Sequence, residues 1–352
     1  MNEAEFNAFI IKLKKELPEF VESLKVADQP GKYKLSPSGD VFENEHWGLA
    51  NSTFATRILF TLNLIEKERE NLVNYILSFK REDGFFVDPE IKKNNIFSRV
   101  KTAIKNLNPK YLSNQGNEMA ETRQAFAALI NLGYEVEPLT ELDLTDQGIT
   151  NYFKSQLWDN VWGASSQINH LLFFIKYSNL TEERKLNLSK LCLEEAINYK
   201  KIYFDKNQNN DLILIGGWMK LLMGLSLFNL TEKLLDNRIV DVCLQNLERK
   251  DACEHFNTVY VLSESLKISD YKRKESIEKI LNTCSEWKKY YHENYSGFSF
   301  NSEKSIEFFY GARVTKGLNQ PDLHGTAMFL WGFLIASKVI DSNQNNLFEP
   351  IL

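Results

Sequence analysis

Acidic and imidazole side chains stand where long apolar stretches of this sequence begin. Asp322 and His324 come directly before the apolar run "GTAMFLWGF", and Glu121 and His255 stand near the starts of two similar runs. A carboxyl group and an imidazole that converge on an apolar pocket can act as general acid and general base, because burial shifts their pKa values. The candidate catalytic residues are therefore His324, Asp322, Glu121 and His255.

The same positions also offer ligands for a metal ion. Asp251, Cys253 and His324 would supply an oxygen, a sulfur and a nitrogen to zinc and leave a fourth position open, as catalytic zinc requires. Helix capping is the alternative for the acids, since Asp251 and Asp322 each precede a helical run and carry the side-chain oxygen that an N-cap needs. The cofactor prediction is zinc or none.

Aromatic and basic side chains in or beside the apolar runs are candidates for holding a substrate. The chain has 24 Phe, 14 Tyr and 6 Trp residues, enough to line an apolar pocket in which a few polar groups orient the ligand. The candidate substrate-binding residues are Trp47, Arg123, His170, Trp162, Trp218, Tyr260, Arg313 and Lys316.

Composition narrows the class of protein. The 352 residues are 43% hydrophobic and 25% charged, with a net charge of −5, which is typical of a globular chain and argues against a dedicated nucleic-acid binder. No apolar run is long enough to span a membrane, and the first residues form an amphipathic helix with no secretory signal. The four cysteines show no CxxC pair, so we expect free thiols in a reducing cytoplasm.

Helical periodicity runs through the chain, and the helices are of two alternating kinds. One kind is amphipathic and charged, and the other is apolar on nearly every face, so it must be buried on all sides. Six amphipathic helices each precede an apolar one. The predicted pairs are 2–25 with 46–64, 67–80 with 118–133, 143–157 with 164–178, 181–200 with 211–229, 231–249 with 252–267, and 271–291 with 322–340.

Six such pairs predict an all-α fold, an (α/α)6 toroid that forms one domain over residues 1–352. The amphipathic helices would form an outer ring and the apolar helices an inner ring around a cavity. An open solenoid is the alternative, but it needs polar capping repeats that this chain lacks at its apolar last pair. Inner helices that run parallel would gather their N-termini at one mouth, which favours an anionic ligand.

Several stretches resemble the terpenoid cyclase and protein prenyltransferase superfamily, whose fold is the α/α toroid. These stretches are "KREDGFFVD" at 80–88, "ETRQAFAALINLG" at 121–133, "LWDNVWGAS" at 157–165 and "KGLNQPDLHGTAMFLWGF" at 316–333. The last is similar to the segment of prenyltransferase β-subunits that carries a zinc-ligand histidine. The resemblance implies Asp251, Cys253 and His324 as zinc ligands, and it places Arg123 at the substrate end of the cavity.

We therefore expect an enzyme that acts on an isoprenoid, as a transferase or a cyclase-like protein that binds a prenyl or polyprenyl diphosphate. Arg123, Arg313 and Lys316 would hold the diphosphate. A non-catalytic toroid that binds a lipid carrier or a protein partner is one alternative, and a partner subunit stays open. A carbohydrate-active toroid is the other, with Glu121 and Asp322 as acid and base and Trp47, Trp158 and Trp162 stacking on sugars.

The zinc prediction is tested by elemental analysis of purified protein. Wild type is expected to hold zinc in equimolar amount, and both Cys253→Ala and His324→Ala are expected to lose it, because removing one of three protein ligands opens the site. Wild-type protein without zinc would contradict the prenyltransferase-like site.

Overall fold

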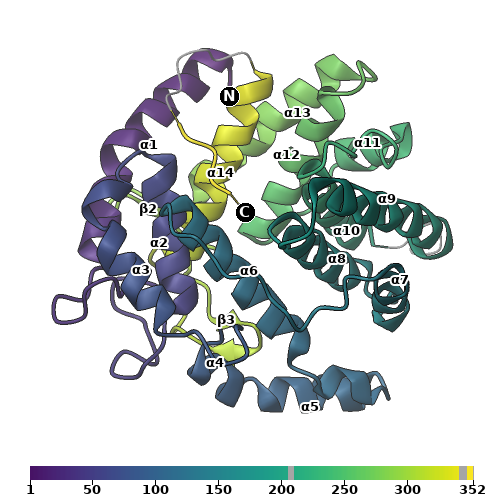
Figure 1. The fold of residues 1–352 in the computed structure, drawn as a ribbon. Helices are drawn as coiled ribbons and strands as arrows, with labels where there is room; N and C mark the ends of the chain where they lie inside the picture. Colours follow the sequence, from purple (N-terminus) through teal and green to yellow (C-terminus); the bar gives the residue numbers. More distant parts are fainter. Residues whose placement is uncertain (205–209, 341–346, 352) are drawn as a thin grey trace. The chain divides into compact units, whose positions relative to one another are not determined.

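The computed structural model describes residues 1–204, 210–340 and 347–351. The described chain is mostly helical with little strand, which confirms the predicted all-α class (Figure 1). It forms two compact units. Unit 1 comprises residues 1–136 and 284–352, and unit 2 comprises residues 137–283. A single toroidal domain over the whole chain stays a prediction.

Unit 1 is built from long helices joined by shorter helical turns. Its elements are α1 (Glu3–Ser23), α2 (Leu49–Thr61), η1 (Ile65–Lys67), α3 (Arg69–Leu77), α4 (Pro89–Asn94), α5 (Ile96–Lys105), η2 (Pro109–Leu112), α6 (Gln115–Asn131), η4 (Trp287–Tyr290) and α14 (Leu323–Val339). Two antiparallel hairpins precede α14, formed by β1 (Tyr291–His292) with β2 (Gly297–Phe298) and by β3 (Phe308–Phe309) with β4 (Ala312–Arg313).

Unit 2 is helical over its described residues. Its elements are α7 (Asp146–Ser155), α8 (Val161–Lys176), α9 (Glu182–Tyr199), the π-helical turn η3 (Lys200–Phe204), α10 (Asp211–Ser226), α11 (Asn237–Leu244) and α12 (Ala252–Leu266). Helix α13 (Arg273–Glu286) continues from unit 2 into unit 1.

All six predicted helix pairs are present in the described chain, with shorter outer helices than expected. The pairs are α1 with α2, α3 with α6, α7 with α8, α9 with α10, α11 with α12, and α13 with α14. The predicted helix 231–249 is reduced to α11 because Asp236 caps it, accepting a hydrogen bond from the Ile239 N–H. Periodicity therefore predicted these helices and their order along the chain, and a side-chain cap explains why α11 begins later than expected.

The apolar helices of unit 1 lie side by side, with α2 between α14 and α6. Helix α1 packs against α2 and α14, and α3 packs against α2 and α6, so each amphipathic helix covers two apolar ones (Figure 1). All but three residues of α14 are buried, as expected for a helix that is apolar on every face.

Contacts at both ends show that these three helices run in the same direction. At the starts, the Leu323 N–H donates to the Leu35 carbonyl (2.9 Å) and Asn51 Nδ2 donates to the neighbouring Tyr33 carbonyl (3.0 Å), which joins α14 to α2. The Phe86 N–H donates to Thr122 Oγ1, near the start of α6 (3.0 Å). Asp88, two residues after Phe86, accepts from the Gly48 N–H at the start of α2 (2.7 Å), so this short segment joins the starts of α6 and α2.

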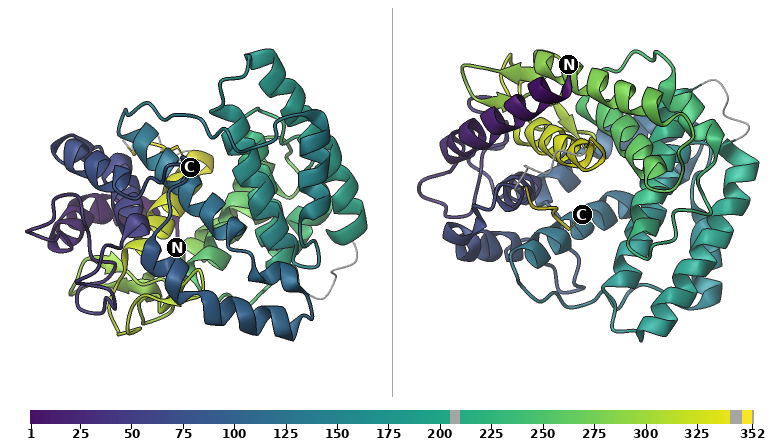
Figure 2. Two further views of the ribbon diagram at one scale, coloured as in Figure 1. Left: turned by 60° about the horizontal axis from the view of Figure 1, so that its bottom comes forward. Right: turned by 90° about the horizontal axis from the view of Figure 1, so that it is seen from above.

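At the opposite ends, residues 347–351 bind all three helices. The Asn131 side chain at the end of α6 donates to the Ile351 carbonyl (2.9 Å) and accepts from the Ile351 N–H (2.8 Å). The Phe348 N–H donates to the Thr61 carbonyl at the end of α2 (3.0 Å), and Lys338 of α14 pairs with Glu349. This segment approaches the ends of α2 and α6 in both views of Figure 2.

In unit 2, α10 lies between α8 and α12, and two glycines bring it close to α8. A Cβ added to Gly216 would lie 2.6 Å from the Trp162 ring, and one added to Gly224 would lie 2.7 Å from Leu172. Early residues of α10 thus meet early residues of α8, and late residues meet late ones. These two inner helices are therefore parallel, as predicted.

In the described part of the chain, no helix is both long enough and apolar enough to cross a membrane. This agrees with the sequence, in which no apolar run has that length.

Gly325 at the start of α14 tests the packing of the inner helices. An added Cβ would lie 2.4 Å from the Phe300 backbone nitrogen, so we expect Gly325→Ala to lower the free energy of unfolding by about 1–3 kcal/mol. Gly163 of α8 is the matched control, because both glycines donate their N–H to the N-cap side chain. Its added Cβ would meet the movable Asn160 amide at 3.0 Å. Urea denaturation should show a change below about 1 kcal/mol for Gly163→Ala, and equal losses in both variants would contradict the packing described.

Candidate functional site

Asp322 organises the start of α14 and the chain in front of it. Its Oδ1 accepts from the Gly325 N–H (2.7 Å) as an N-cap, and its Oδ2 accepts from the N–H groups of Phe300 (2.8 Å) and Ile306 (2.9 Å). Burial raises the pKa of Asp322 to about 6, although these backbone donors oppose the rise. Both oxygens are used to hold backbone, so its contacts support the capping alternative, and its catalytic role stays a prediction.

His324 lies between aromatic rings. Its imidazole stacks on Phe54 of α2 (centroids 4.5 Å apart, planes at 7°) and on Phe300 (4.5 Å, 27°), while Phe309 meets it edge-on at 5.6 Å. The ring is half-buried. This packing fixes the plane of the imidazole, which is a condition for directed proton transfer.

A small hollow of about 10 Å³ lies beside His324, which is room for roughly one water molecule. It is lined by residues of α2, of the loop before α2, of α4, of strand β3 and of the start of α14, together with chain beside these elements. The lining residues are Leu35, Trp47, Ala50, Asn51, Phe54, Asp88, Ile91, Ile306, Phe309, Val314 and His324. Trp47 and His324, both predicted site residues, are thus brought together.

Asp88 connects this hollow to Glu121. Its Oδ1 caps α4 by accepting from the Glu90 and Ile91 N–H groups, and its Oδ2 accepts from the first amides of α2. In "REDGFFVDPE" the sequence favours a turn followed by a Pro-stopped loop over an acid–base pair of Asp83 and Asp88. The structure shows that Asp88 is also a helix cap. Asp83 pairs with Arg81 at the surface.

Glu121 is a buried acid that faces Asp88 from α6. Its side chain is 2% exposed, and neither carboxyl oxygen has a hydrogen bond of normal geometry in the described chain. Burial raises the pKa of Glu121 well above its usual value and the nearby Asp88 raises it further, while the Asp88 backbone N–H opposes the rise. Glu121 therefore favours its neutral form, in which it can donate a proton.

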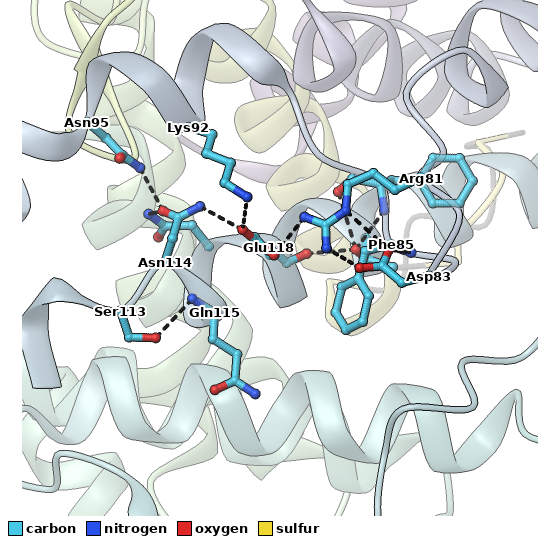
Figure 3. Close-up of polar contacts among 12 residues, drawn as sticks. Arg81, Asp83, Phe85, Lys92, Asn95, Ser113, Asn114, Gln115 and Glu118 are labelled. Atoms are coloured by element: carbon cyan, nitrogen blue, oxygen red, sulfur yellow. Dashed lines mark hydrogen bonds and ion pairs between the residues drawn. The ribbon is translucent and has the colours of Figure 1, made fainter.

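One turn earlier on α6, Glu118 has the opposite environment. It pairs with Arg81 (3.0 Å) and Lys92 (3.0 Å) and accepts from Asn114 (3.3 Å), as Figure 3 shows. Burial alone would raise the pKa of Glu118, but the hydrogen bonds and charges of its partners outweigh it and lower the pKa. Two glutamates three residues apart are thus driven toward opposite protonation states.

Arg123 is the second buried charge on α6. Its side chain is 5% exposed, and its Nε and Nη1 atoms have no hydrogen-bond partner among the described residues. Burial lowers the pKa of Arg123, and the nearby Tyr310 opposes that shift. Tyr310 stands at the tip of the β3–β4 hairpin with Gly311, both in the left-handed region, and its hydroxyl accepts from Gln124 Nε2 (2.8 Å).

Two of the three proposed zinc ligands have other contacts within their own units. The Asp251 carboxylate caps α12 by accepting from the Glu254 N–H (3.0 Å), and the ring of His324 stacks between aromatic side chains. Asp251 and Cys253 belong to unit 2, whereas His324 belongs to unit 1. Across the described ranges, no group of three or more His, Cys, Asp or Glu side chains is arranged to hold a metal. The zinc site stays a prediction from the resemblance.

The remaining predicted residues fall into a buried group and an exposed pair. His255, His170, Trp218 and Tyr260 are buried in unit 2, where His170 contacts Ser166 (3.3 Å), Trp218 packs on Phe204 and Tyr260 packs on Phe256. Trp162 is half-buried against Gly216. Arg313 and Lys316 are exposed, and Arg313 pairs with Glu307 (3.1 Å), so no observed contact joins them to Arg123.

Two of the three tryptophans named for the carbohydrate alternative give it no support. Trp158 is buried in a stack with Phe153 and Tyr199, and Trp47 is buried against Phe42. Neither ring offers a free face on which a sugar could stack.

Sequence reasoning missed three residues of this site. Asp88 was assigned to a turn alone, Tyr310 was passed over, and Arg57 of α2, which lies over the Phe54 and Trp331 rings, was not considered. A charged residue inside an apolar helical run was the available signal for Arg57. Tyr310 had no such signal, because a hairpin with two residues in each strand is too short to show strand periodicity.

The opposed glutamates predict opposite pH dependences for two matched variants. Below its usual pKa of 4.5, Glu121 is neutral in both folded and unfolded chains, so Glu121→Gln should unfold with nearly the same free energy as wild type. As the pH rises, only the unfolded chain ionises and wild type loses stability by up to about 1.4 kcal/mol per pH unit, so the variant becomes the more stable protein.

Glu118→Gln is the control and should behave in the reverse way. Because the folded chain favours ionised Glu118, the variant should be less stable than wild type at pH 7, and the difference should fade as the pH drops below 4.5. Urea titrations between about pH 3 and pH 8 measure both differences. If the free energy of unfolding of both variants followed the same pH dependence as that of wild type, the environments described for Glu121 and Glu118 would be contradicted.

No protein-family model, no curated protein and no solved structure matches the chain. The likeness to terpenoid cyclases and prenyltransferases therefore stays a prediction, and the candidate site rests on Glu121, Arg123, His324 and their neighbours.

Proposed function

We propose that this protein is an isoprenoid-acting enzyme, transferase-like or cyclase-like, that binds a prenyl or polyprenyl ligand with an anionic head along the inner helices. The proposal includes the closed (α/α)6 toroid. One observation carries it: the buried guanidinium of Arg123 has two nitrogens without partners in the described chain.

A buried cation without an anion is strongly unfavourable, and such groups in native proteins normally have a partner. No carboxylate of the described residues forms an ion pair with Arg123. Glu121, two residues away on the same helix, favours its neutral form and makes no ion pair with it. An anionic ligand is the simplest group that would satisfy the guanidinium, and a phosphate matches its planar set of donors.

The surroundings of α6 favour a ligand with an apolar body. The ring centroids of Phe309 and Tyr310 in the hairpin lie 4.1 Å apart with their planes tilted by 45°, and Phe54 of α2 meets Phe309 edge-on at 6.0 Å. Each CH2 group of an isoprenoid chain buried among such side chains contributes about 0.8 kcal/mol. Aromatic faces also stabilise positive charge, as Arg57 over Phe54 and Trp331 illustrates, and would do so for a carbocation.

In this proposal Glu121 is the proton donor. A carboxyl group that stays neutral in an apolar setting can donate its proton to a leaving oxygen of a bound ligand, and its carboxylate would then take a proton back. His324, held flat between Phe54 and Phe300, is the second acid–base group. Asp322 positions the backbone around His324, and no step uses a metal.

A non-catalytic lipid-binding protein is the second candidate. It is favoured by Asp322, a predicted catalytic acid whose two oxygens both hold backbone amides. The same ligand would bind at Arg123 in either case. Turnover of the bound ligand separates the two, because a binding protein returns the prenyl diphosphate unchanged.

Arg123→Met tests the proposed anion site. Replacing an unpaired buried charge by an apolar side chain should make the ligand-free protein more stable, by about 1–4 kcal/mol. The same variant should bind farnesyl diphosphate about 10-fold to 100-fold more weakly, since a charge-assisted hydrogen bond contributes about 1.5–3 kcal/mol. Urea denaturation and calorimetric titration measure the two effects.

Arg313→Met is the control, because its exposed guanidinium pairs with Glu307. It should change the affinity less than about two-fold. Wild-type protein that binds neither farnesyl diphosphate nor inorganic pyrophosphate, or that binds as tightly after Arg123→Met, would contradict the proposal.

A further inference from the structure

Helix α5 of unit 1 turns its apolar side chains away from the protein. Phe97 is 84% exposed, Ile104 is 68% exposed and Leu107, just after the helix, is 91% exposed. Ile96, Val100 and Leu112 of η2 are exposed as well. We call these six residues the α5 surface. Single exposed apolar residues are ordinary, but a contiguous set marks an interaction site.

The spacing of these residues gives one continuous stripe. Phe97, Val100, Ile104 and Leu107 follow one another at intervals of three or four, which places them on one side of a helix. The opposite side faces the protein: Ser98 lies against Gly311 of the β3–β4 hairpin, and Arg99 donates to the Leu112 carbonyl (2.6 Å). Helix α5 runs along the edge of unit 1 in Figure 1 and in the left view of Figure 2.

The charge around the stripe has one sign. Between Glu90 and Glu118 the sequence contains no acidic residue and six basic ones, so this segment carries +6 in a chain whose net charge is −5. The basic residues are Lys92, Lys93, Arg99, Lys101, Lys105 and Lys110. Lys92 pairs with Glu118 and Lys93 with Glu90 at the inner edge, whereas Lys101 and Lys105 lie at the flank of the stripe by helical position.

We propose that the α5 surface docks on an anionic lipid membrane, with α5 lying in the plane of the interface. The apolar stripe would enter the boundary between headgroups and acyl chains, while Lys101 and Lys105 would contact lipid phosphates. An amphipathic helix with aromatic and aliphatic residues on one side and Lys residues beside them has the composition of such interfacial helices.

The positive charge around the α5 surface favours an anionic membrane over a second copy of the chain or a neutral apolar partner. A second copy of the chain would bring an equal basic segment against the first, and like charges at an interface oppose association. A neutral apolar partner would leave the Lys side chains without counter-charges. An anionic bilayer supplies both an apolar layer and negative charge. The inference does not rest on the proposed function, since it concerns a surface that Arg123 and Glu121 do not share.

Flotation of the full chain with lipid vesicles tests the proposal. Wild type should float with phosphatidylcholine vesicles that contain about 30% phosphatidylglycerol and much less with pure phosphatidylcholine, because each Lys near an anionic surface adds roughly five-fold to the partition coefficient. Raising the salt to about 0.5 M should release it. Lys101→Glu with Lys105→Glu should weaken binding by about 20-fold or more.

The triple variant Phe97→Ser, Ile104→Ser, Leu107→Ser should lose binding while its circular dichroism and melting temperature stay close to wild type, because the three side chains are exposed. The matched control changes three exposed apolar residues elsewhere, Ile11→Ser, Leu64→Ser and Leu186→Ser, and should float as wild type does.

Four results would overturn the proposal. The first two are no flotation of wild type with anionic vesicles and equal flotation with neutral and anionic vesicles. The third is a triple Ser variant that still binds vesicles. The fourth is a wild-type dimer in light scattering together with a triple Ser variant that is monomeric. The last would assign the α5 surface to self-association.

Discussion

Helices that are buried on every side leave the polar groups at their ends without water, and the rest of unit 1 is arranged around that constraint. At the starts of α2 and α14 the backbone amides are satisfied by Asp88 and Asp322, each of which also holds a second segment of chain. At the other ends, the Thr61 carbonyl of α2 accepts from the Phe348 N–H, and the Asn131 side chain of α6 binds Ile351 through both its amide atoms. The acids that drew attention in the sequence are thus first of all structural, and burial raises the pKa of both.

The same burial explains why Glu121 and Arg123 stand out. Other buried polar groups of unit 1, such as Asp88 and Asp322, accept several hydrogen bonds, so their burial is compensated. Glu121 responds to burial by favouring its neutral form, which a carboxyl group can do within the ordinary pH range. Arg123 cannot respond in that way, because an arginine keeps its proton at any ordinary pH. A ligand that brings negative charge to α6 would pair with the Arg123 guanidinium and leave Glu121 as a neutral acid beside it.

Much of the fold could be predicted, because an apolar helix of four turns leaves a periodic pattern that few other structures share. The alternation of amphipathic and apolar helices predicted the helices of all six pairs in chain order, and the parallel direction of α2, α6 and α14 was predicted from the expected ring. The hairpins before α14, helix α4 and helix α5 were missed. Two-residue strands show no alternation, and the stripe of α5 was hidden among Lys and Asn residues. The net charge of the chain did not reveal this basic segment either, because acidic residues elsewhere make the total charge −5.

The candidate site was predicted only in part. Glu121, Arg123 and His324 were named from their positions at the starts of apolar runs, and the structure gives each an unusual environment. That Asp322 holds three backbone amides could not be read from its neighbours in sequence, because two of its partners lie 16 and 22 residues away. Asp88 and Tyr310 contact α6 through tertiary structure, and their types and spacing gave no sign of it.

A crystal structure with a non-hydrolysable prenyl thiodiphosphate tests the central claim most directly. The account predicts an oxygen of the diphosphate at about 2.7–3.0 Å from Nε or Nη1 of Arg123, with the prenyl chain against the aromatic side chains beside α6. A diphosphate bound elsewhere, with Arg123 satisfied by ordered water or by the protein itself, would contradict it.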